Sequence, residues 1–331
     1  MGEWSDVCVL VPTYNEAAAI GDVVDGFREQ GFEHVLVMDG GSTDGTRQVA
    51  RERGAEVRQQ TGSGKGQAVR EAISLIERPY VLLVDGDATY RPEDAPEMLD
   101  PLLNGEAEHV VGNRFADMET GAMSRLNRVG NRLINRAFRF VHGRDFADIL
   151  SGYRAFTIDS VRRFALTADG FGIETEMAVE CVKHNVPTEV VPITYKRRPE
   201  GADTNLSPFR DGAVILLTLY RMAKTNNPLF YFGSIGSLSV LAGIGLGVYV
   251  AVEWFTRNIS HEVIAVLATL AIIFGVQLLI FGVLSDMIVT LHREQLHFIE
   301  RVAREGERAG DESEYRSDDA KAAQNGTSDR N

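Results

Sequence analysis

The chain has 331 residues, 44% of them hydrophobic, which is enough for a sizeable buried core and a further segment. Its 47 acidic and 34 basic residues give a formal net charge of −13, and this disfavours a nucleic-acid-binding protein, which is normally basic. The two cysteines, Cys8 and Cys181, lie in apolar stretches and do not suggest a disulfide framework.

The first half of the chain alternates strand-like and helix-like stretches. We predict strands at 7–12, 34–39, 80–85 and 108–113, and helices at 16–30, 43–54 and 66–77. Farther along, we predict helices at 123–141 and 173–185 and a strand at 189–195. Continuously apolar strands that alternate with helices indicate an α/β fold, with a mainly parallel sheet covered by helices.

Polar residues follow several of these strands. They occur at 12–16, 39–42, 85–87 and 112–114. In a parallel sheet the carboxyl ends of the strands meet at one edge, where ligands bind. We therefore expect these residues to converge on one rim of the domain.

Asp85 and Asp87 are separated only by Gly86 at the end of a predicted strand. If the strand continued, both carboxylates would point to the same face. Two like charges that lie close together repel unless a cation sits between them, and a divalent metal beside phosphate is the usual reason for such a pair. The pair therefore predicts a metal site.

A glycine-rich segment, GSGKGQA at 62–68, precedes the helix predicted at 66–77. The P-loop pattern fails because Gln59 and Gly66 stand where it needs Gly and Ser or Thr, and the dinucleotide-binding pattern fails because Gln67 stands where it needs Gly. What remains is a glycine turn that presents Lys65 near a helix start, where a diphosphate can bind.

The last third of the chain predicts attachment to a membrane. Residues 207–227 form an amphipathic stretch, read as a helix at the membrane interface, and 228–290 contain two uncharged segments long enough to cross a bilayer, 229–252 and 263–285. Basic residues precede the first span and follow the second, so we expect both termini and the catalytic domain to be cytoplasmic. The polar tail, 291–331, is predicted to be largely disordered.

Several motifs in order resemble family 2 glycosyltransferases, which have the GT-A nucleotide-sugar fold and an Asp-x-Asp metal motif. They are LVPTYNE, MDGGSTDGT, GKGQA, VDGD, GNRF, DILSGYRAF, FGIETEM and ITYKRRPEGADTNL. The later motifs look like the polyprenyl-phosphate sugar synthases, including the dolichyl-phosphate mannose and glucose synthases. The resemblance covers about residues 6–210 and implies a catalytic domain at 1–206. The acidic composition favours a haloarchaeal dolichyl-phosphate hexosyltransferase of N-glycan assembly.

The resemblance implies a role for each candidate residue. Nucleotide contacts would come from Pro12, Tyr14, Glu16 and Asp39, and a diphosphate contact from Lys65. Mg²⁺ or Mn²⁺ would be held by Asp85 and Asp87. The lipid phosphate or the diphosphate would meet Arg114, Arg154 and Arg198.

Structural alternatives exist for several polar residues. Asp39 could cap the following helix, and Arg114 and Arg154 could be structural ion-pair partners, with Asp148 orienting one of them. Glu174 and Glu176 could lie on the acceptor side or on a solvated helix face. The basic residues Arg125, Arg128, Arg132 and Arg136 could face anionic lipid or water.

The implied reaction transfers a hexose from a nucleotide sugar to dolichyl phosphate with inversion. The acceptor oxygen is already anionic, so no general base is needed. UDP-glucose is favoured as donor over GDP-mannose. The alternatives are transfer to another lipid acceptor or to a polysaccharide, and an inactive membrane scaffold that binds nucleotide sugar.

Three positions depart from the family pattern. Gly40 replaces the second carboxylate that commonly follows Asp39, and Thr89 stands where some synthases have a third metal ligand. The segment that begins at Arg198 lacks the usual lysine. These departures concern the metal geometry and the acceptor contacts.

Overall fold

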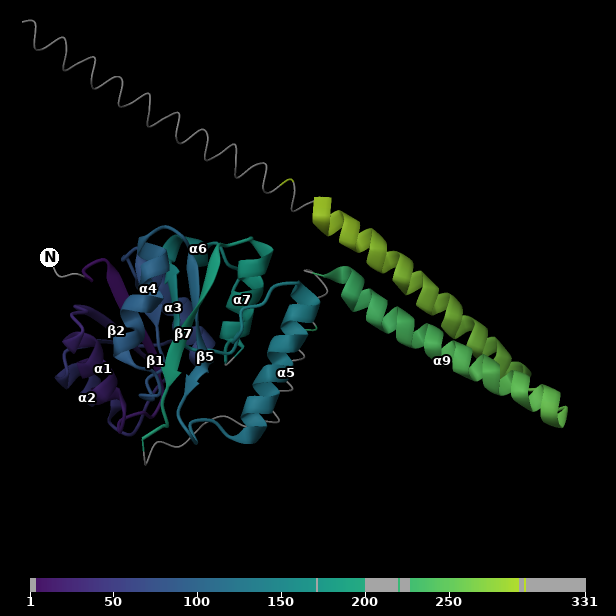
Figure 1. Cartoon of the computed structure of the whole chain (residues 1–331), viewed down its shortest axis with the longest axis horizontal. Helices are drawn as coiled ribbons and strands as arrows, with labels where there is room; N and C mark the ends of the chain where they lie inside the picture. The colour runs from purple at the N-terminus through teal and green to yellow at the C-terminus, as the bar shows by residue number, and fades with distance from the viewer. Residues whose placement is uncertain (1–3, 171, 200–219, 221–226, 292–294, 296–331) are drawn as a thin grey trace, which may run out of the picture. The chain divides into compact units, whose positions relative to one another are not determined.

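The computed structural model describes residues 4–170, 172–199, 220, 227–291 and 295 (Figure 1). The chain divides after Ala223 into two units, which we describe separately. The predicted interface helix at 207–227, except Tyr220 and Asn227, lies outside the described residues. So does the predicted tail at 291–331, except residues 291 and 295.

The described part of the first unit contains a seven-stranded sheet with the order β3-β2-β1-β4-β6-β5-β7. The strands are β1 (Val7–Thr13), β2 (His34–Asp39), β3 (Glu56–Gln59), β4 (Tyr80–Leu83), β5 (His109–Met118), β6 (Arg154–Thr157) and β7 (Thr188–Tyr195). β1 to β4 are parallel where they pair, and β6 runs antiparallel to both β4 and β5. The sheet is therefore mainly parallel, as predicted, with one reversed strand in its middle.

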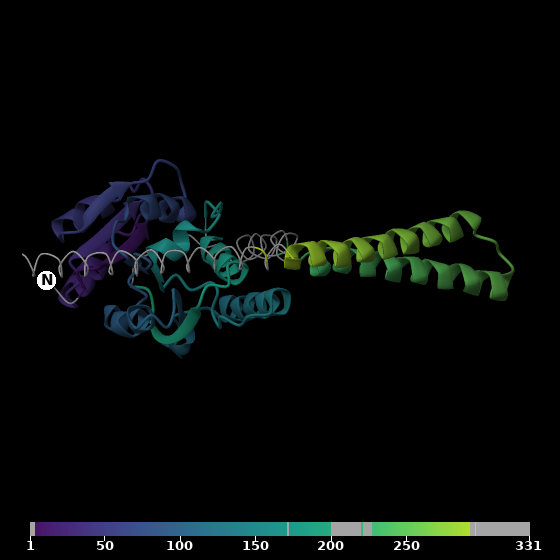
Figure 2. The ribbon, with the colours of Figure 1, turned by 90° about the horizontal axis from the view of Figure 1, so that it is seen from above.

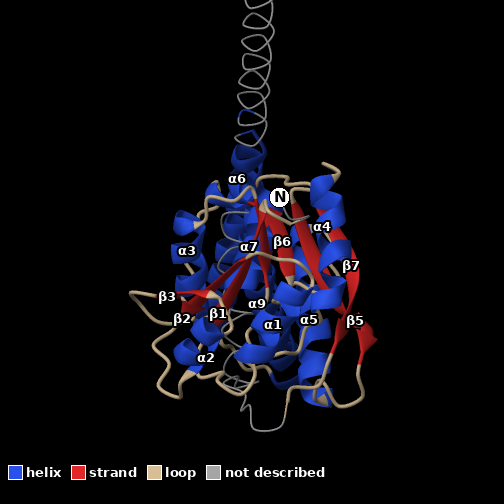
Figure 3. Cartoon of the chain, turned by 90° about the vertical axis from the view of Figure 1, so that its left-hand side faces the viewer, coloured by secondary structure: helices blue, strands red, loops and turns tan. Residues whose placement is uncertain are grey.

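Helices cover both faces of the sheet (Figure 3). They are α1 (Ile20–Glu29), α2 (Thr46–Glu52), α3 (Lys65–Leu75), α4 (Ala95–Leu103), α5 (Arg125–His142), α6 (Ile158–Arg162) and α7 (Ile173–Lys183), with a 3₁₀ turn at Pro92–Asp94. Alternate residues of β1 enter two separate cores, because side chains alternate along a strand. One core includes side chains of α3, α5, α6 and α7, and the other includes α1, α2 and α4.

The predicted strand at 80–85 is shorter in the structure, since β4 ends at Leu83. Asp85 and Asp87 therefore lie in the turn after the strand, and the argument from alternating side chains was wrong for them. β3 was not predicted because it is a short, largely exposed edge strand without an apolar run. The predicted strand at 108–113 continues to Met118, which places Arg114 inside β5.

The second unit contains two long apolar helices, α9 (Pro228–Arg257) and a helix at Glu262–Leu291. Both are long and apolar enough to cross a membrane, and only 11% of the most apolar stretch of each is buried. They lie side by side (Figure 2), and a Cβ added at Gly236 would be 2.7 Å from the carbonyl oxygen of Gly275. Small residues thus let the two backbones approach closely, as in packed transmembrane helices.

Candidate active site

The loops at the carboxyl ends of β1 and β2 are joined by hydrogen bonds. The Asn15 N–H donates to Ser42 Oγ at 2.9 Å, and Asn15 Oδ1 accepts from the Thr43 N–H at 3.0 Å. The Glu16 N–H donates to Thr46 Oγ1 at 2.9 Å. Asn15 has a φ of 55°, a left-handed conformation that asparagine adopts more readily than most residues. These bonds fix the two loops in one arrangement.

Asp39 is fully buried where β2 ends. Its Oδ2 accepts hydrogen bonds from the N–H groups of Gly41 and Ser42, each at 3.0 Å, and lies 3.4 Å from Arg47 Nε. Its Oδ1 has no hydrogen-bond partner among the described residues. A buried carboxylate oxygen without a donor is costly, so this atom is available to an N–H or O–H group of a ligand.

Tyr14 and Pro12 differ in their access to a ligand. The Tyr14 side chain is 50% exposed and packs beside Gly40, where an added Cβ would lie 3.4 Å from the ring. Pro12 is buried within β1 and pairs in register with Met38 of β2. Tyr14 can therefore stack on a flat ligand, whereas Pro12 supports the strand.

Lys65 begins α3, and its ammonium group bridges the carboxylates of Asp85 and Glu174. Burial lowers the pKa of Lys65, but the two carboxylates outweigh burial and the pKa is raised overall. Lys65 therefore stays charged. Glu174 lies on a buried face of α7, not on the solvated face that was one of the two expectations for it.

Glycines allow the close packing around Lys65 and Asp85. A Cβ added at Gly152 would lie 2.3 Å from Asp85 Oδ2. A Cβ added at Gly66 would lie 2.0 Å from the carbonyl oxygen of Ala168. The absence of side chains at these two positions brings the glycine turn and Asp85 against segments far away in sequence.

Asp87 is held by a hydroxyl group and a guanidinium group. Its Oδ1 accepts from the Thr89 N–H at 3.1 Å and from the Thr89 hydroxyl at 2.6 Å, and its Oδ2 pairs with Arg198. Ala88, between them, has a φ of 58°, which is uncommon for alanine and typical of tight functional turns. Thr89 therefore orients Asp87 in this structure.

Glu16 joins this cluster through Arg198, whose Nη1 lies 3.7 Å from Glu16 Oε1. Burial raises the pKa of Glu16 to about 7, with Asp87 and Asp85 adding to the shift and Arg198 opposing it. Four carboxylates, those of Glu16, Asp85, Asp87 and Glu174, thus share two cations, Lys65 and Arg198. The site has an excess of negative charge that a bound cation would offset.

The donor set fits a divalent cation only in part. Among the described residues no group of three Asp, Glu, His or Cys side chains has the arrangement of a metal site. Asp85 and Asp87 offer two hard oxygen ligands, and Mg²⁺ is commonly bound through one or two carboxylates together with substrate phosphates. The two aspartates therefore fit a metal that a diphosphate helps to hold.

Arg114 is paired with Asp148 by two hydrogen bonds, of 2.6 and 2.8 Å. It also donates to Asn131 Oδ1 at 3.2 Å and lies over the ring of Tyr195 at 5.4 Å. Burial lowers the pKa of Arg114, but the paired Asp148 raises it well above the usual value overall. Asp148 therefore orients this arginine, as one sequence interpretation proposed.

Arg154 is a correction to the predicted site, because it lies inside the domain. It is fully buried and donates to the carbonyl oxygens of Ser151 at 3.0 Å and Ile149 at 2.6 Å, and it lies 3.1 Å from His109 Nε2. These interior partners occupy its guanidinium group. Its geometry is that of a structural residue and does not support a phosphate contact.

Glu176 is also buried and holds the loop that follows α6. Its carboxylate accepts from the N–H groups of Thr167 and Ala168, both at 2.8 Å, and from the Thr167 hydroxyl at 2.6 Å. The next residue of that loop, Asp169, accepts at its carbonyl oxygen from the Gly66 N–H at 2.9 Å. Glu176 therefore supports the glycine turn and lies on no solvated face.

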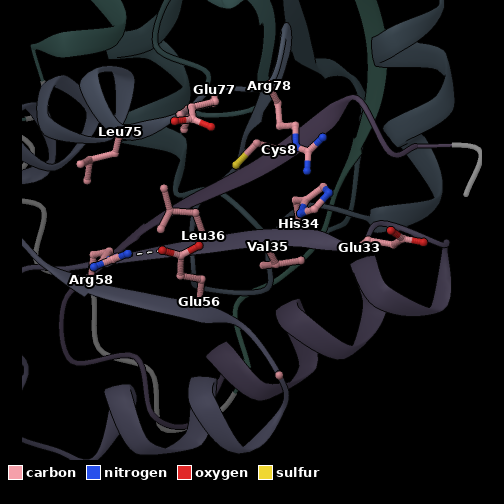
Figure 4. Close-up of a pocket in the computed structure, with 12 residues that line it drawn as sticks. Cys8, Glu33, His34, Val35, Leu36, Glu56, Arg58, Leu75, Glu77 and Arg78 are labelled. Atoms are coloured by element: carbon pink, nitrogen blue, oxygen red, sulfur yellow. Dashed lines mark hydrogen bonds and ion pairs between the residues drawn. The ribbon is translucent and has the colours of Figure 1, made fainter. Parts of the chain in front are cut away.

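A cavity of about 370 Å³ lies at the opposite ends of the strands (Figure 4). Cys8, His34 and Glu56, which line it, are near the amino ends of β1, β2 and β3. None of the predicted site residues lines this cavity. It is therefore separate from the candidate site.

The sequence did not identify Gly152 as part of the site, and it identified Thr89 only as a departure from the family pattern, not as the hydrogen-bond partner of Asp87. Both are in segments with a recognisable pattern, DILSGYRAF and VDGD followed by Ala88-Thr89, but the pattern does not reveal what they touch. The contact of Gly152 with Asp85 follows from the pairing of β6 with β4, two strands that are not consecutive in the chain.

Comparison with known proteins agrees with these features. Residues 8–165 match the family model of glycosyl transferase family 2. The chain is 64% identical over 297 residues to glycosyltransferase AglJ of Haloferax volcanii, covering 89% of this chain and 98% of that protein. It is 35% identical over 215 residues to a dolichyl-phosphate hexose transferase of the same organism, covering 64% of this chain and 91% of that protein.

More distant proteins are similar over the α/β domain. A polyprenol monophosphomannose synthase of Mycolicibacterium smegmatis is 28% identical over 208 residues, covering 58% of this chain and 78% of that protein. A crystal structure of glucosyl-3-phosphoglycerate synthase from Mycobacterium tuberculosis with phosphoglyceric acid has a TM-score of 0.55 at 23% identity, covering 65% of this chain and 79% of that one. This likeness confirms the predicted GT-A fold.

Proposed function

The chain belongs to glycosyl transferase family 2, and from this premise we propose that it transfers a hexose from a nucleotide sugar to dolichyl phosphate. The product would be a dolichyl-phosphate hexose for protein N-glycosylation. UDP-glucose is the favoured donor, and GDP-mannose is the second candidate. Two relatives are named for dolichyl or polyprenol acceptors, and this supports a lipid acceptor. The two candidate membrane spans support it as well.

The observation that carries the proposal is the charge cluster that follows β1 and β4. Asp85 and Asp87 offer carboxylates, while Lys65 and Arg198 offer cations beside them. A reaction between a nucleotide sugar and a lipid phosphate brings two anionic groups together, so positive charge is needed beside the diphosphate and the phosphate. The free Oδ1 of Asp39 and the exposed ring of Tyr14 supply groups suited to a nucleotide base or ribose.

The proposed chemistry is a direct displacement at the anomeric carbon. An oxygen of the lipid phosphate forms the new bond to C1 of the sugar while the bond from C1 to the diphosphate oxygen breaks. The electron pair leaves with the nucleoside diphosphate, and attack from the opposite side inverts C1. No proton needs to be removed from the acceptor, since its oxygen is already anionic.

The chain's own residues would bind and orient both reactants. Lys65 and Arg198 would contact the diphosphate and the departing oxygen, and Arg114, fixed by Asp148, would meet a phosphate oxygen on the acceptor side. Mg²⁺ or Mn²⁺ held by Asp85 and Asp87 would supply further positive charge to the diphosphate. We leave Arg154 out of this group because of its interior hydrogen bonds.

The proposed location is the cell membrane, with both candidate helices as spans and the catalytic domain and termini in the cytoplasm. The basic residues Arg221 and Lys224 before α9, and His292 and Arg293 after the second helix, support this orientation. In this orientation the catalytic domain would bind its nucleotide sugar from the cytoplasm.

Membranes that contain the full chain test the function directly. They would be incubated in high salt with dolichyl phosphate, Mg²⁺ and labelled UDP-glucose or GDP-mannose in separate samples. We expect label in the organic extract from one donor, and its loss with a chelator. Asp87→Asn should lower transfer by about 100-fold or more, whereas Asp100→Asn, an exposed carboxylate of α4, should leave it unchanged.

The two other functions predict different results. Label that appears without added dolichyl phosphate, in a different lipid, would favour another lipid acceptor. No transfer from a wide panel of donors by folded protein that still binds nucleotide would overturn the proposal in favour of a scaffold.

A further inference from the structure

Tyr90 is a buried residue that follows the turn with Asp85 and Asp87, and only 4% of it is exposed. Its hydroxyl oxygen accepts a hydrogen bond from the N–H of Gly152 at 2.9 Å. The two residues are 62 positions apart in the chain, so this bond joins two separate segments. A buried N–H group that loses its acceptor is costly, and the hydroxyl therefore fixes the backbone at Gly152.

The backbone at Gly152 in turn limits where Asp85 can lie. A Cβ added at Gly152 would be 2.3 Å from Asp85 Oδ2, so this carboxylate oxygen packs directly against the glycine. The other oxygen of Asp85 pairs with Lys65. The hydroxyl of Tyr90 therefore acts on Asp85 through Gly152.

The backbone beside Tyr90 is joined to the end of β7. Tyr90 and Tyr195 form an antiparallel bridge, and the Lys196 N–H donates to the carbonyl oxygen of Thr89 at 2.8 Å. The hydroxyl of Thr89 donates to Asp87 at 2.6 Å. The pairing with β7 therefore anchors the residue that orients Asp87.

The ring of Tyr90 lies on the arginine side of the site. Its centroid is 5.5 Å from that of Tyr195, and the guanidinium group of Arg114 lies over the Tyr195 ring at 5.4 Å. The Tyr90 ring also packs against Tyr153, with 5.2 Å between the centroids. Tilted aromatic rings at such separations attract each other. One residue thus supports Asp85 with its hydroxyl and Arg114 with its ring.

We propose that Tyr90 is a positioning residue that sets the arrangement of Asp85 relative to Arg114. In the transfer reaction proposed above, on which this role rests, Asp85 serves the metal and the donor diphosphate, and Arg114 serves the acceptor phosphate. Direct displacement requires the two reactants in a defined geometry. A misplacement of about 1 Å caused by a change away from the reacting atoms can lower a rate about 100-fold.

Tyr90→Phe separates the two contacts, because it removes the hydroxyl and keeps the ring. The Gly152 N–H then loses its acceptor, while the ring still packs against Tyr195. Mn²⁺ would be titrated onto the purified full chain in detergent, with UDP and with GDP in separate samples, and free Mn²⁺ would be measured by electron paramagnetic resonance. We expect the Mn²⁺ concentration at half-saturation to rise about tenfold in the variant.

Transfer assays with the same variant give a second readout. The Mg²⁺ concentration that gives half the maximal rate should rise by the same factor as the Mn²⁺ half-saturation. The KM for dolichyl phosphate should change by less than about twofold, because the ring still supports Tyr195 and Arg114. A general loss of packing would change both quantities.

Tyr153→Phe is the matched control. Tyr153 is fully buried, and its hydroxyl donates to the carbonyl oxygen of Arg91 at 3.2 Å. The control therefore loses a tyrosine hydroxyl and its hydrogen bond, as Tyr90→Phe does, but keeps the acceptor of Gly152. It should leave Mn²⁺ half-saturation unchanged, and thermal unfolding would show that both variants fold.

The outcomes are distinct. An unchanged Mn²⁺ half-saturation in Tyr90→Phe would overturn the proposal, and so would an equal rise in Tyr153→Phe. A parent chain that binds no Mn²⁺ with either nucleotide would overturn it together with the metal role of Asp85. A parent chain that binds Mn²⁺ and nucleotide but transfers no sugar would contradict only the proposed function, and the binding comparison would still decide the role of Tyr90.

A second measurement needs no variant and decides the matter if Tyr90→Phe does not fold. Amide hydrogen exchange of the parent chain would be followed in the peptide that contains Gly152. Mn²⁺ with nucleotide should slow exchange of the Gly152 N–H, because holding Asp85 also holds the glycine packed against it. Exchange at Gly152 that does not respond to Mn²⁺ with either nucleotide would overturn the proposal.

Discussion

Gly152 determines where the carboxylate of Asp85 can lie. Because an added Cβ would be 2.3 Å from Asp85 Oδ2, Gly152→Ala should displace Asp85 from Lys65. We expect transfer activity to fall by about 100-fold, with a stability cost of about 1–3 kcal/mol from overpacking. Initial rates and thermal unfolding of the purified chain measure the two effects. Gly130→Ala is the control, since its Cβ would meet no atom within 4 Å; a Gly152 variant with normal activity would contradict the argument.

Glu16 makes stability depend on pH. Its pKa in the folded chain is about 7, above the ordinary 4.5, so folding favours the neutral form. The stabilisation is complete below pH 4.5 and is lost as pH rises through 7. Glu16→Gln stays neutral, so we expect it to be more stable than the parent chain at pH 8, by on the order of 2 kcal/mol, and about equal at pH 4.

Unfolding of both proteins in chelator at several pH values would measure this difference. The exposed Glu106→Gln is the matched control and should follow the parent chain throughout. A constant difference between Glu16→Gln and the parent chain at every pH would contradict the assigned pKa.

At single residues, sequence patterns predicted which side chains lie together better than they predicted how those side chains pack. They placed Asp85, Asp87 and Lys65 correctly in one cluster, because each follows or precedes an element whose end is visible in the hydropathy pattern. They placed Arg154 wrongly among the phosphate contacts. A charged residue beside a motif can point outward or inward, and only the surrounding strands decide which.

At the scale of elements, Arg154 stabilises the connection between the segment at 149–151 and β6. Lysine cannot reach both the Ile149 and Ser151 carbonyl oxygens in the same way, because it lacks the planar arrangement of donors. We expect Arg154→Lys to lower the free energy of unfolding by about 2–3 kcal/mol while the KM for dolichyl phosphate changes little. Arg163→Lys, an exposed position, should change stability by less than about 0.5 kcal/mol. A normal unfolding curve with a raised KM would restore Arg154 to the site.

The predicted elements with strong periodicity or long apolar runs were confirmed, including β1, β2, α5 and α7. β3 and β6 were missed because they lack such a pattern, whereas β4, which also has four residues, was predicted from its apolar run. The order of strands could not be read from the chain either. β6 enters the sheet between β4 and β5, and this non-consecutive pairing brings Gly152 to Asp85.

At the scale of the whole chain, the composition of each segment distinguishes the α/β domain from the two long apolar helices. The α/β domain buries its apolar residues in two cores, whereas the helices α9 and Glu262–Leu291 leave theirs exposed. This division was predictable because hydropathy is a property of each segment by itself. The acidic balance of 47 to 34 residues and the arginines of α5 are equally visible in the sequence, but which side chains of α5 are exposed is known only from the structure.

The two long apolar helices would anchor the proposed transferase in the bilayer. Its rate would then respond differently to dilution of the buffer and to dilution of the lipid. An enzyme and a lipid acceptor that share one bilayer meet by lateral diffusion, so the relevant quantity is the mole fraction of acceptor in the lipid. Adding buffer to proteoliposomes should leave the rate per enzyme unchanged when the donor concentration is held constant. Fusing them with acceptor-free lipid should lower the rate in proportion to the added membrane area.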